Sequence, residues 1–247
     1  MPRLSVRGIE FHFEDCGGGP PLLCIPGALG SGATDFGPHL EGFSRHFRVI
    51  APDPRGYGQS RPPERDFPRD FFERDAHDMA ALMSACGCEV FNVAGWSDGA
   101  NVAMLLAALY PSRVRKLAIW GGNSYISAED DDRLQRIRLV HNWSRRIREP
   151  LEATYGDRLQ ELWSRYCDGL HDLYLAGGEI CRDKLHLIRC PTLILHGALD
   201  PLVPEFHPRL LAQRIAKSSL KTFPDGGHNF HLLLADEFSA AVKTFLQ

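Results

Sequence analysis

A serine between two glycines follows a short apolar run near the middle of the chain. Residues 93–99 read V-A-G-W-S-D-G, which places Ser97 in a G-x-S-x-G pattern. Residues 89–94 favour a strand, and apolar residues recur at helical spacing over 100–110. This order predicts a sharp strand-to-helix turn that exposes the Ser97 hydroxyl, with Gly95 and Gly99 removing Cβ atoms that would collide there. Ser97 is the candidate nucleophile.

An acid and a histidine follow later in the chain, each after a predicted strand. Asp200 comes after the apolar segment 191–197, and His228 comes after the short segment 220–223. Serine, acid and histidine in this order, each at the carboxyl end of a strand, are typical of an α/β-hydrolase. His228 would take the proton of Ser97, and Asp200 would orient and stabilise the imidazolium.

Other residues could compete for two of these roles. Asp225 and Asp53 are alternative acids, although Asp225 lies only three residues before His228. His196 and His207 are alternative bases, but the first lies inside a predicted strand and the second lies beyond the acid-bearing loop.

A glycine-rich turn, P-G-A-L-G at residues 26–30, follows the apolar segment 21–25. We expect the backbone N–H of Ala28 or Leu29 to pair with the N–H of Asp98 as an oxyanion hole. The alternative is a flexible loop without a catalytic role.

Asp98 places an acidic side chain directly after the candidate nucleophile. Its charge could simply favour the positive end of the following helix. It could instead bind the α-ammonium group of a substrate, because an ion pair at about 4 Å contributes roughly 4 kcal/mol at an effective dielectric of 20. The residues themselves leave both interpretations open.

The remaining patterns predict one α/β core interrupted by a helical segment. A hairpin over residues 4–13, strands over 47–51 and 115–120, and helices over 71–86 and 232–246 surround the motifs. We expect a mostly parallel central sheet with helices on both faces, formed by residues 1–121 and 190–247. Residues 122–189 would form a helical lid that sets substrate choice. In the loop after strand 47–51, we expect Asp53 and Arg55 to hydrogen-bond each other.

The composition argues against several classes of binding partner. The 247 residues carry a net charge of −3, and no basic cluster suggests nucleic-acid binding. No segment approaches the roughly 20 apolar residues of a membrane span. No metal-binding spacing appears, so we expect no metal or cofactor. We also expect a small-molecule ester as substrate, and a monomer.

Seven cysteines, an odd number without a C-x-x-C pair, predict free thiols in a reducing intracellular compartment. The first residues lack the apolar stretch of a secretory signal. The compartment would be the cytoplasm, or the mitochondrion if a leader has been removed.

Seven sequence blocks resemble the valacyclovir hydrolase (biphenyl hydrolase-like) family of α/β-hydrolases. They are PGALGSG at 26–32, TDFGP at 34–38, DPRGYG at 53–58, FFERD at 71–75, GWSDG at 95–99, DPLVP at 200–204 and ADEF at 235–238. The resemblance implies hydrolysis of α-amino acid esters, with Asp98 contacting the substrate amino group. Ala28 departs from the larger apolar residue expected in that family, so the pocket wall there would differ.

The resulting prediction is a serine hydrolase that cleaves valacyclovir-like aminoacyl esters through an acyl-enzyme, a route that amino acid thiolactones could also follow. A general carboxylesterase or a carbon–carbon bond hydrolase would use the same three residues. A ligand receptor on the same fold, which would not turn over, is the alternative from another class.

Overall fold

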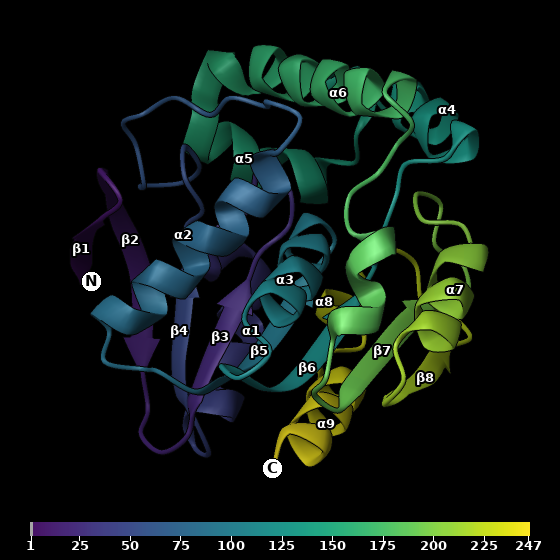
Figure 1. Cartoon of the computed structure of the whole chain (residues 1–247). Helices are drawn as coiled ribbons and strands as arrows, with labels where there is room; N and C mark the ends of the chain where they lie inside the picture. The colour runs from purple at the N-terminus through teal and green to yellow at the C-terminus, as the bar shows by residue number, and fades with distance from the viewer. Residues whose placement is uncertain (1) are drawn as a thin grey trace.

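The computed structural model describes residues 2–247, which form an eight-stranded sheet in the order β1-β2-β4-β3-β5-β6-β7-β8 (Figure 1). β1 pairs antiparallel with β2, and β2 pairs antiparallel with β4, whereas all other neighbours are parallel. The strands are β1 (Arg3–Val6), β2 (Ile9–Cys16), β3 (Pro21–Ile25), β4 (Arg48–Pro52), β5 (Phe91–Trp96), β6 (Val114–Trp120), β7 (Thr192–Gly197) and β8 (Ser218–Phe223). The predicted α/β class with a mostly parallel sheet is confirmed.

Helices cover both faces of this sheet. α2 and α3 lie on the face toward the viewer in Figure 1, and α1 and α9 pack on the opposite face. The helices are α1 (Gly32–Ser44), α2 (Phe71–Ala85), α3 (Asp98–Leu109), α4 (Ala128–Arg136), α5 (Arg145–Tyr155), α6 (Leu159–Leu175), α7 (Phe206–Arg214), α8 (Phe230–Leu233) and α9 (Ala235–Leu246). Short 3₁₀ helices occupy Val140–Asn142, Gly156–Arg158 and Arg182–Leu187.

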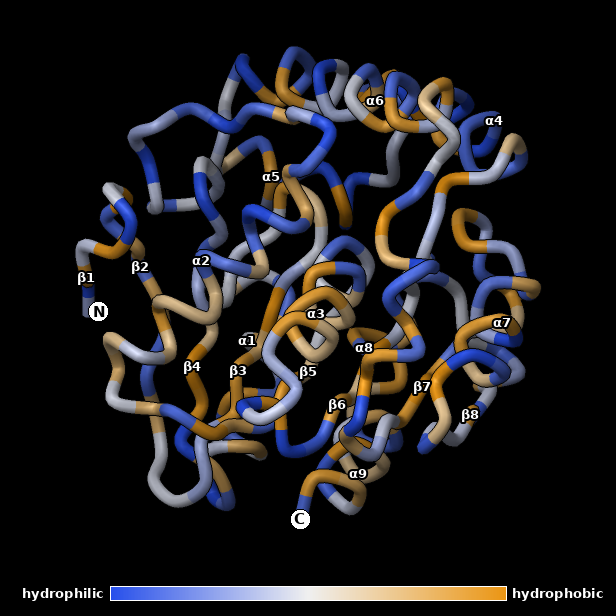
Figure 2. The backbone as a smooth tube through the Cα atoms, in the orientation of Figure 1, coloured by the Kyte–Doolittle hydropathy of each residue, from blue (hydrophilic) through white to orange (hydrophobic). Residues whose placement is uncertain are grey.

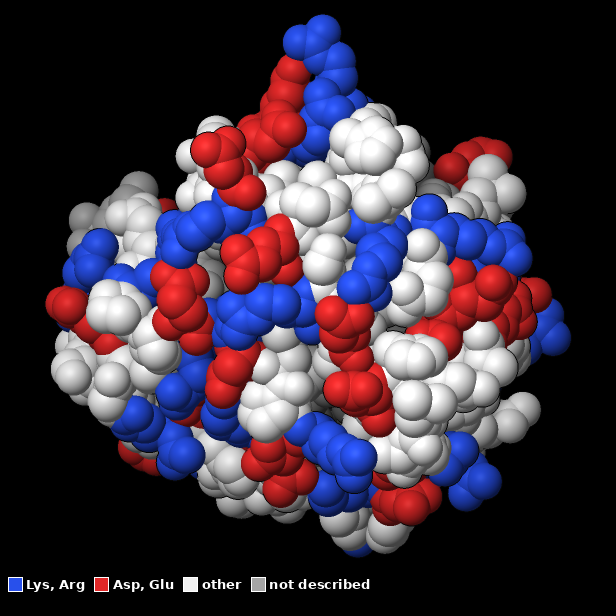
Figure 3. Space-filling model, turned by 90° about the horizontal axis from the view of Figure 1, so that it is seen from above, with Lys and Arg blue, Asp and Glu red and all other residues white. Residues whose placement is uncertain are grey.

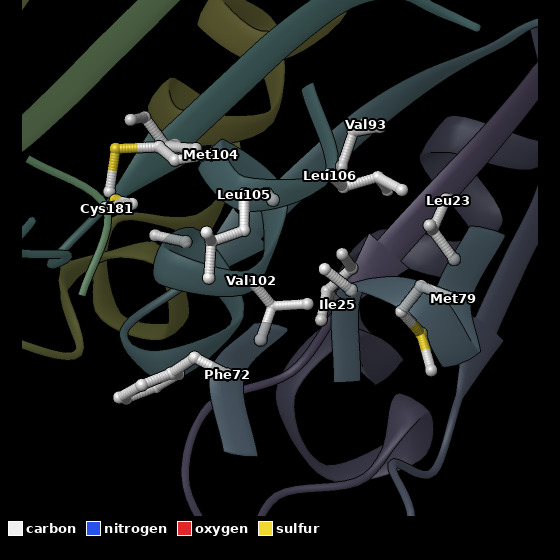
Figure 4. Packing of buried hydrophobic residues seen from close by; sticks show 14 of the residues in the cluster. Leu23, Ile25, Phe72, Met79, Val93, Val102, Met104, Leu105, Leu106 and Cys181 are labelled. Atoms are coloured by element: carbon white, nitrogen blue, oxygen red, sulfur yellow. The ribbon is translucent and has the colours of Figure 1, made fainter. Parts of the chain in front are cut away.

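The central strands are apolar on both faces because both are covered, which is why they appear as continuous hydrophobic runs (Figure 2). Figure 4 shows Ile25 of β3 and Val93 of β5 meeting the helix residues Met79, Val102 and Leu106. All five side chains are buried, with at most 4% exposed. This packing anchors the start of α3, which follows Ser97 directly, to the strands beneath it.

The segment 122–189 leaves the sheet after β6 and returns at β7. Its helices α4, α5 and α6 lie across the end of the sheet at which the parallel strands finish (Figure 1). The 3₁₀ helix Arg182–Leu187 packs against α3. Side chains of this segment can therefore reach the loops that follow β3, β5 and β7.

Two helices have no counterpart in the sequence-based expectations. α1 contains Pro38 and three glycines, which weaken the helical pattern in the sequence. The burial of its Phe36 and Phe43 against the rest of the protein stabilises the helix. α7 is also unpredicted. The single helix expected over 232–246 is wrong in detail, because the chain breaks at Leu234 between α8 and α9.

The expected bond between Asp53 and Arg55 is also wrong. The Asp53 carboxylate accepts the backbone N–H groups of Gly32 (3.2 Å) and Gln59 (2.8 Å) and contacts Nδ1 of His12 (3.2 Å). Arg55 instead donates to Asp78, at 2.7 and 3.0 Å. Asp53 still secures the loop after β4, but it does so through backbone amides.

Charges of both signs alternate over the face above α4, α5 and α6, and neither sign gathers into a patch there (Figure 3). Among residues 2–247, no helix has both the length and the apolar character that crossing a bilayer requires.

Asp75→Asn should destabilise the chain much more than Asp15→Asn. Asp75 forms a two-pronged pair with Arg65 (2.6 and 2.9 Å) in which the two side chains are only 6% and 2% exposed. Breaking a buried pair leaves an uncompensated charge and should lower the free energy of unfolding by about 3 kcal/mol.

The Asp15–Arg48 pair is partly exposed, at 24% and 34%, and serves as the matched control. Its loss should cost about 1 kcal/mol or less. Urea unfolding measures both, and equal losses would contradict the role of burial.

Candidate active site

Ser97 occupies a strained turn between β5 and α3. Its backbone has φ 55° and ψ −121°, a left-handed region that is costly for a residue with a Cβ. A Cβ on Gly99 would strike the carbonyl oxygens of Ile25 and Pro26, and a Cβ on Gly95 would strike the carbonyl of Gly99. The two glycines therefore permit the helix to approach the strands closely enough for the turn to form.

His228 lies between Ser97 and Asp200. Its Nε2 is 3.1 Å from Oγ of Ser97, and its Nδ1 is 2.9 Å from Oδ2 of Asp200. Oδ1 of Asp200 accepts the backbone N–H groups of Leu202 (2.8 Å) and Val203 (2.9 Å). With its proton on Nδ1, His228 donates to Asp200 and presents Nε2 as an acceptor for the serine hydroxyl.

This arrangement shifts both ionisation equilibria. Burial alone would raise the pKa of Asp200, but the neighbouring His228 and the two backbone N–H groups outweigh it and lower that pKa. Burial alone would lower the pKa of His228, but the Asp200 carboxylate outweighs it and raises that pKa above 6.5. The pair therefore favours an imidazolium once a proton arrives.

The alternative acids and bases are not hydrogen-bonded to Ser97 or His228 in the described part of the chain. Asp53 contacts His12, and His207 is buried against Asp130 at 2.8 Å. Within residues 2–247, His196 and Asp225 form no hydrogen bond with Ser97 or His228.

The turn that carries Ala28 and Leu29 lies beside Ser97. The turn at 26–30 is closed by the N–H of Gly30 bonding to the carbonyl of Gly27 at 3.1 Å. Gly27 lies so close that a Cβ there would be 3.2 Å from Cβ of Ser97. In the part of the chain that the structure describes, the N–H groups of Ala28, Leu29 and Asp98 have no protein acceptor. All three remain available to a ligand.

Asp98 has one bonded and one unbonded carboxylate oxygen. Oδ1 accepts the hydroxyl of Tyr166 at 2.8 Å, whereas Oδ2 is buried without a partner in the described residues. Burial raises the pKa of Asp98 to about 7, against the opposing effects of Tyr166 and Arg65. A buried acceptor without a donor is costly, so Oδ2 is suited to a cationic donor from a ligand.

Four further residues shape the site without a local sequence signal. Tyr155 and Tyr166 arrive from the segment 122–189, where they appear as ordinary apolar positions of helices. Trp96 donates Nε1–H to the carbonyl of His228 at 3.1 Å. Gly121 has φ 61°, and a Cβ there would be 3.0 Å from the His228 ring. The positive φ of Gly121 and the long-range contacts of the other three residues are visible only in the structure.

No group of three or more His, Cys, Asp or Glu side chains within residues 2–247 is arranged to hold a metal ion.

Comparisons with known proteins identify the family of the chain. The family model described as alpha/beta hydrolase fold matches residues 20–173 and 151–233. The chain is 49% identical to "Serine hydrolase BPHL" of Mus musculus and 46% identical to that of Homo sapiens, each over 99% of this chain and 86% of the relative.

Among solved structures, the meta-cleavage product hydrolase CumD of Pseudomonas fluorescens IP01 superposes with a TM-score of 0.82. The two chains are 22% identical, and the match covers 99% of this chain and 97% of the other. At this identity the superposition supports the fold alone. The family match and the two nearly full-length relatives show that the chain belongs to the α/β-hydrolase family, as one of its serine hydrolases.

Proposed function

We propose that the protein hydrolyses α-amino acid esters through an acyl-enzyme on Ser97, without a cofactor. The observation that carries this choice is the unpaired, buried Oδ2 of Asp98 next to the nucleophile. The resemblance of the surrounding blocks to valacyclovir hydrolase supports the same substrate class.

In the first half-reaction, Ser97 attacks the ester carbonyl while His228 takes the hydroxyl proton. The N–H groups of Asp98 and of Ala28 or Leu29 receive the oxygen as it becomes anionic. His228 then returns the proton to the leaving alcohol. A water, again deprotonated by His228, attacks the acyl-enzyme and releases the free acid. Asp200 holds the imidazole in the required tautomer throughout.

An α-ammonium group on the substrate would complete the environment of Asp98. It would donate to Oδ2 while Tyr166 retains Oδ1. It would also neutralise a negative charge that otherwise lies beside the developing oxyanion and opposes catalysis. Since the α-carbon is attached directly to the reacting carbonyl, the ammonium and the oxyanion can be held at the same time. The positive end of the α3 dipole also stabilises the charged form of Asp98, but by a smaller amount.

We assign residues 122–189 the role of a lid over a core formed by residues 1–121 and 190–247. Three contacts support this division. Tyr166 binds Asp98, Tyr155 binds the turn after β3, and Arg133 donates to the carbonyl of Asp200 at 3.3 Å. The lid thus touches the loops after β3 and β7 and the start of α3 after β5, which is where substrate choice would be made.

Asp98→Asn should erase discrimination for the free amine. The parent should cleave a valine ester with a kcat/KM about 100- to 1000-fold higher than its N-acetyl counterpart, as expected from an ion pair of about 4 kcal/mol with some screening. The variant keeps the backbone N–H and an acceptor for Tyr166 and loses the opposing charge, so its activity on the N-acetyl ester should be retained or rise. Steady-state kinetics on both esters measure this. Equal rates for the parent would indicate a general carboxylesterase.

The acid limb of the pH profile should be steeper for the valine ester than for its N-acetyl counterpart. His228, whose pKa is raised above 6.5, must be neutral to act as base, so both esters should lose activity as the pH falls. Asp98, with a pKa of about 7, must also be ionised to bind the ammonium. A two-proton limb for the valine ester that becomes one-proton in Asp98→Asn would support this assignment. A one-proton limb in the parent would contradict it.

Ser97→Ala should remove turnover and retain folding. Loss of the nucleophile should lower kcat by at least ~1000-fold, whereas the circular dichroism spectrum should be unchanged. Release of many equivalents of alcohol per parent chain would exclude a receptor that reacts once. Retention of esterase activity by the variant would show that Ser97 is not the nucleophile.

A further inference from the structure

A hydroxyl from the segment 122–189 joins two loops of the core beside the active site. Tyr155 ends α5 and is 4% exposed. Its hydroxyl donates to the carbonyl of Leu29 at 2.7 Å and accepts the N–H of Gly58 at 3.0 Å. These partners are 126 and 97 residues away in the sequence, so one buried group connects the turn after β3, the loop after β4 and the inserted segment.

Leu29 adopts a backbone conformation that needs such support. Its φ of 60° lies in the left-handed region, which a leucine rarely adopts without external constraints. Asp35 holds the first residue of the turn by accepting the N–H of Gly27 at 2.9 Å. The Gly30 N–H closes the turn onto the Gly27 carbonyl. Tyr155 supplies a further restraint, on the carbonyl of Leu29 itself.

We propose that Tyr155 is a positioning residue for the oxyanion hole. Without its hydroxyl, Leu29 can relax toward negative φ, and the N–H groups of Ala28 and Leu29 then turn away from the position of the oxyanion. The inserted segment would thereby influence the chemical step as well as substrate access. This inference rests on the proposed serine-esterase chemistry of Ser97, but it is independent of amine recognition by Asp98.

Arg61 holds Tyr155 from the outer side. Its guanidinium lies 5.1 Å from the centre of the tyrosine ring. Nε of Arg61 donates to the carbonyl of Gly58 at 2.7 Å, and Nη2 donates to the carbonyl of Thr154 at 3.3 Å. Removing this side chain would loosen the tyrosine while leaving its hydroxyl and both hydroxyl partners in place.

The test is Tyr155→Phe, which keeps the ring and removes the hydroxyl. The matched control is Tyr110→Phe, which loses a hydroxyl bonded to His77 (2.7 Å) at the far end of α3. That end is about 18 Å from Ser97 for a helix of this length. Each protein is assayed with a valine ester, with p-nitrophenyl butyrate, which has no amine, and with a trifluoromethyl ketone whose hemiketal oxygen is anionic.

Tyr155→Phe should lower kcat about 10- to 100-fold on both esters, less than the loss of a whole oxyanion donor, with KM within about 3-fold. The ketone should bind more weakly by the same factor as the loss in kcat/KM, and Tyr110→Phe should match the parent. An unchanged kcat, a higher KM with kcat retained, or unaltered ketone binding would overturn the proposal.

The amine-free ester distinguishes this proposal from the proposed substrate class. If the parent shows no preference for the valine ester, amine recognition fails while the comparison on p-nitrophenyl butyrate still decides the role of Tyr155. If Tyr155→Phe does not fold, Arg61→Met replaces it, with an expected loss in kcat of about 3- to 10-fold at unchanged KM. A kcat equal to that of the parent in Arg61→Met would then overturn the proposal.

Discussion

The close approach of α3 to the carboxyl ends of the strands is the constraint on which the site depends. It forces Ser97 to φ 55°, and only the missing Cβ atoms of Gly95 and Gly99 allow it. The strain is sustained because α3 is buried almost along its whole length, so relaxing the turn would require the helix to leave the core. The same geometry leaves the Asp98 N–H free beside the hydroxyl, and His228 reaches the serine from a neighbouring loop.

Two buried carboxylates close to His228 have opposite shifts because their surroundings differ. Asp200 has donors for both oxygens, which lowers its pKa, whereas Asp98 has one donor and burial raises its pKa to about 7. The first is suited to stabilising an imidazolium inside the protein. The second holds a charge that the protein itself only half satisfies, and an external ammonium could complete it. On this account, the enzyme selects its substrate because Oδ2 of Asp98, next to the nucleophile, has no hydrogen-bond donor among residues 2–247.

The position of a residue could be predicted from the sequence where it follows from local order. Ser97, Asp200 and His228 each follow a strand, and parallel strands bring their ends together whatever the packing details. Prediction failed where partners were chosen by packing: Asp53 bonds to backbone amides that no side-chain pattern reveals. Tyr155 and Tyr166 could not be recognised either, because a helical spacing of aromatic residues does not say which hydroxyl reaches across more than sixty residues to a core loop. α1 was missed since its proline and glycines weaken the helical pattern, which tertiary burial overrides.

The central claim is that one bound substrate places its ammonium on Asp98 and its oxyanion on the backbone N–H groups at the same time. The most direct measurement is a crystal structure of Ser97 phosphonylated by the phosphonate analogue of a valine ester, whose tetrahedral phosphorus stands in for the reacting carbon. The account predicts the amino nitrogen within hydrogen-bonding distance of Oδ2 of Asp98, and the phosphonyl oxygen facing the N–H of Asp98 and of Ala28 or Leu29. An amino group directed away from Asp98, with Oδ2 still unpaired, would contradict it.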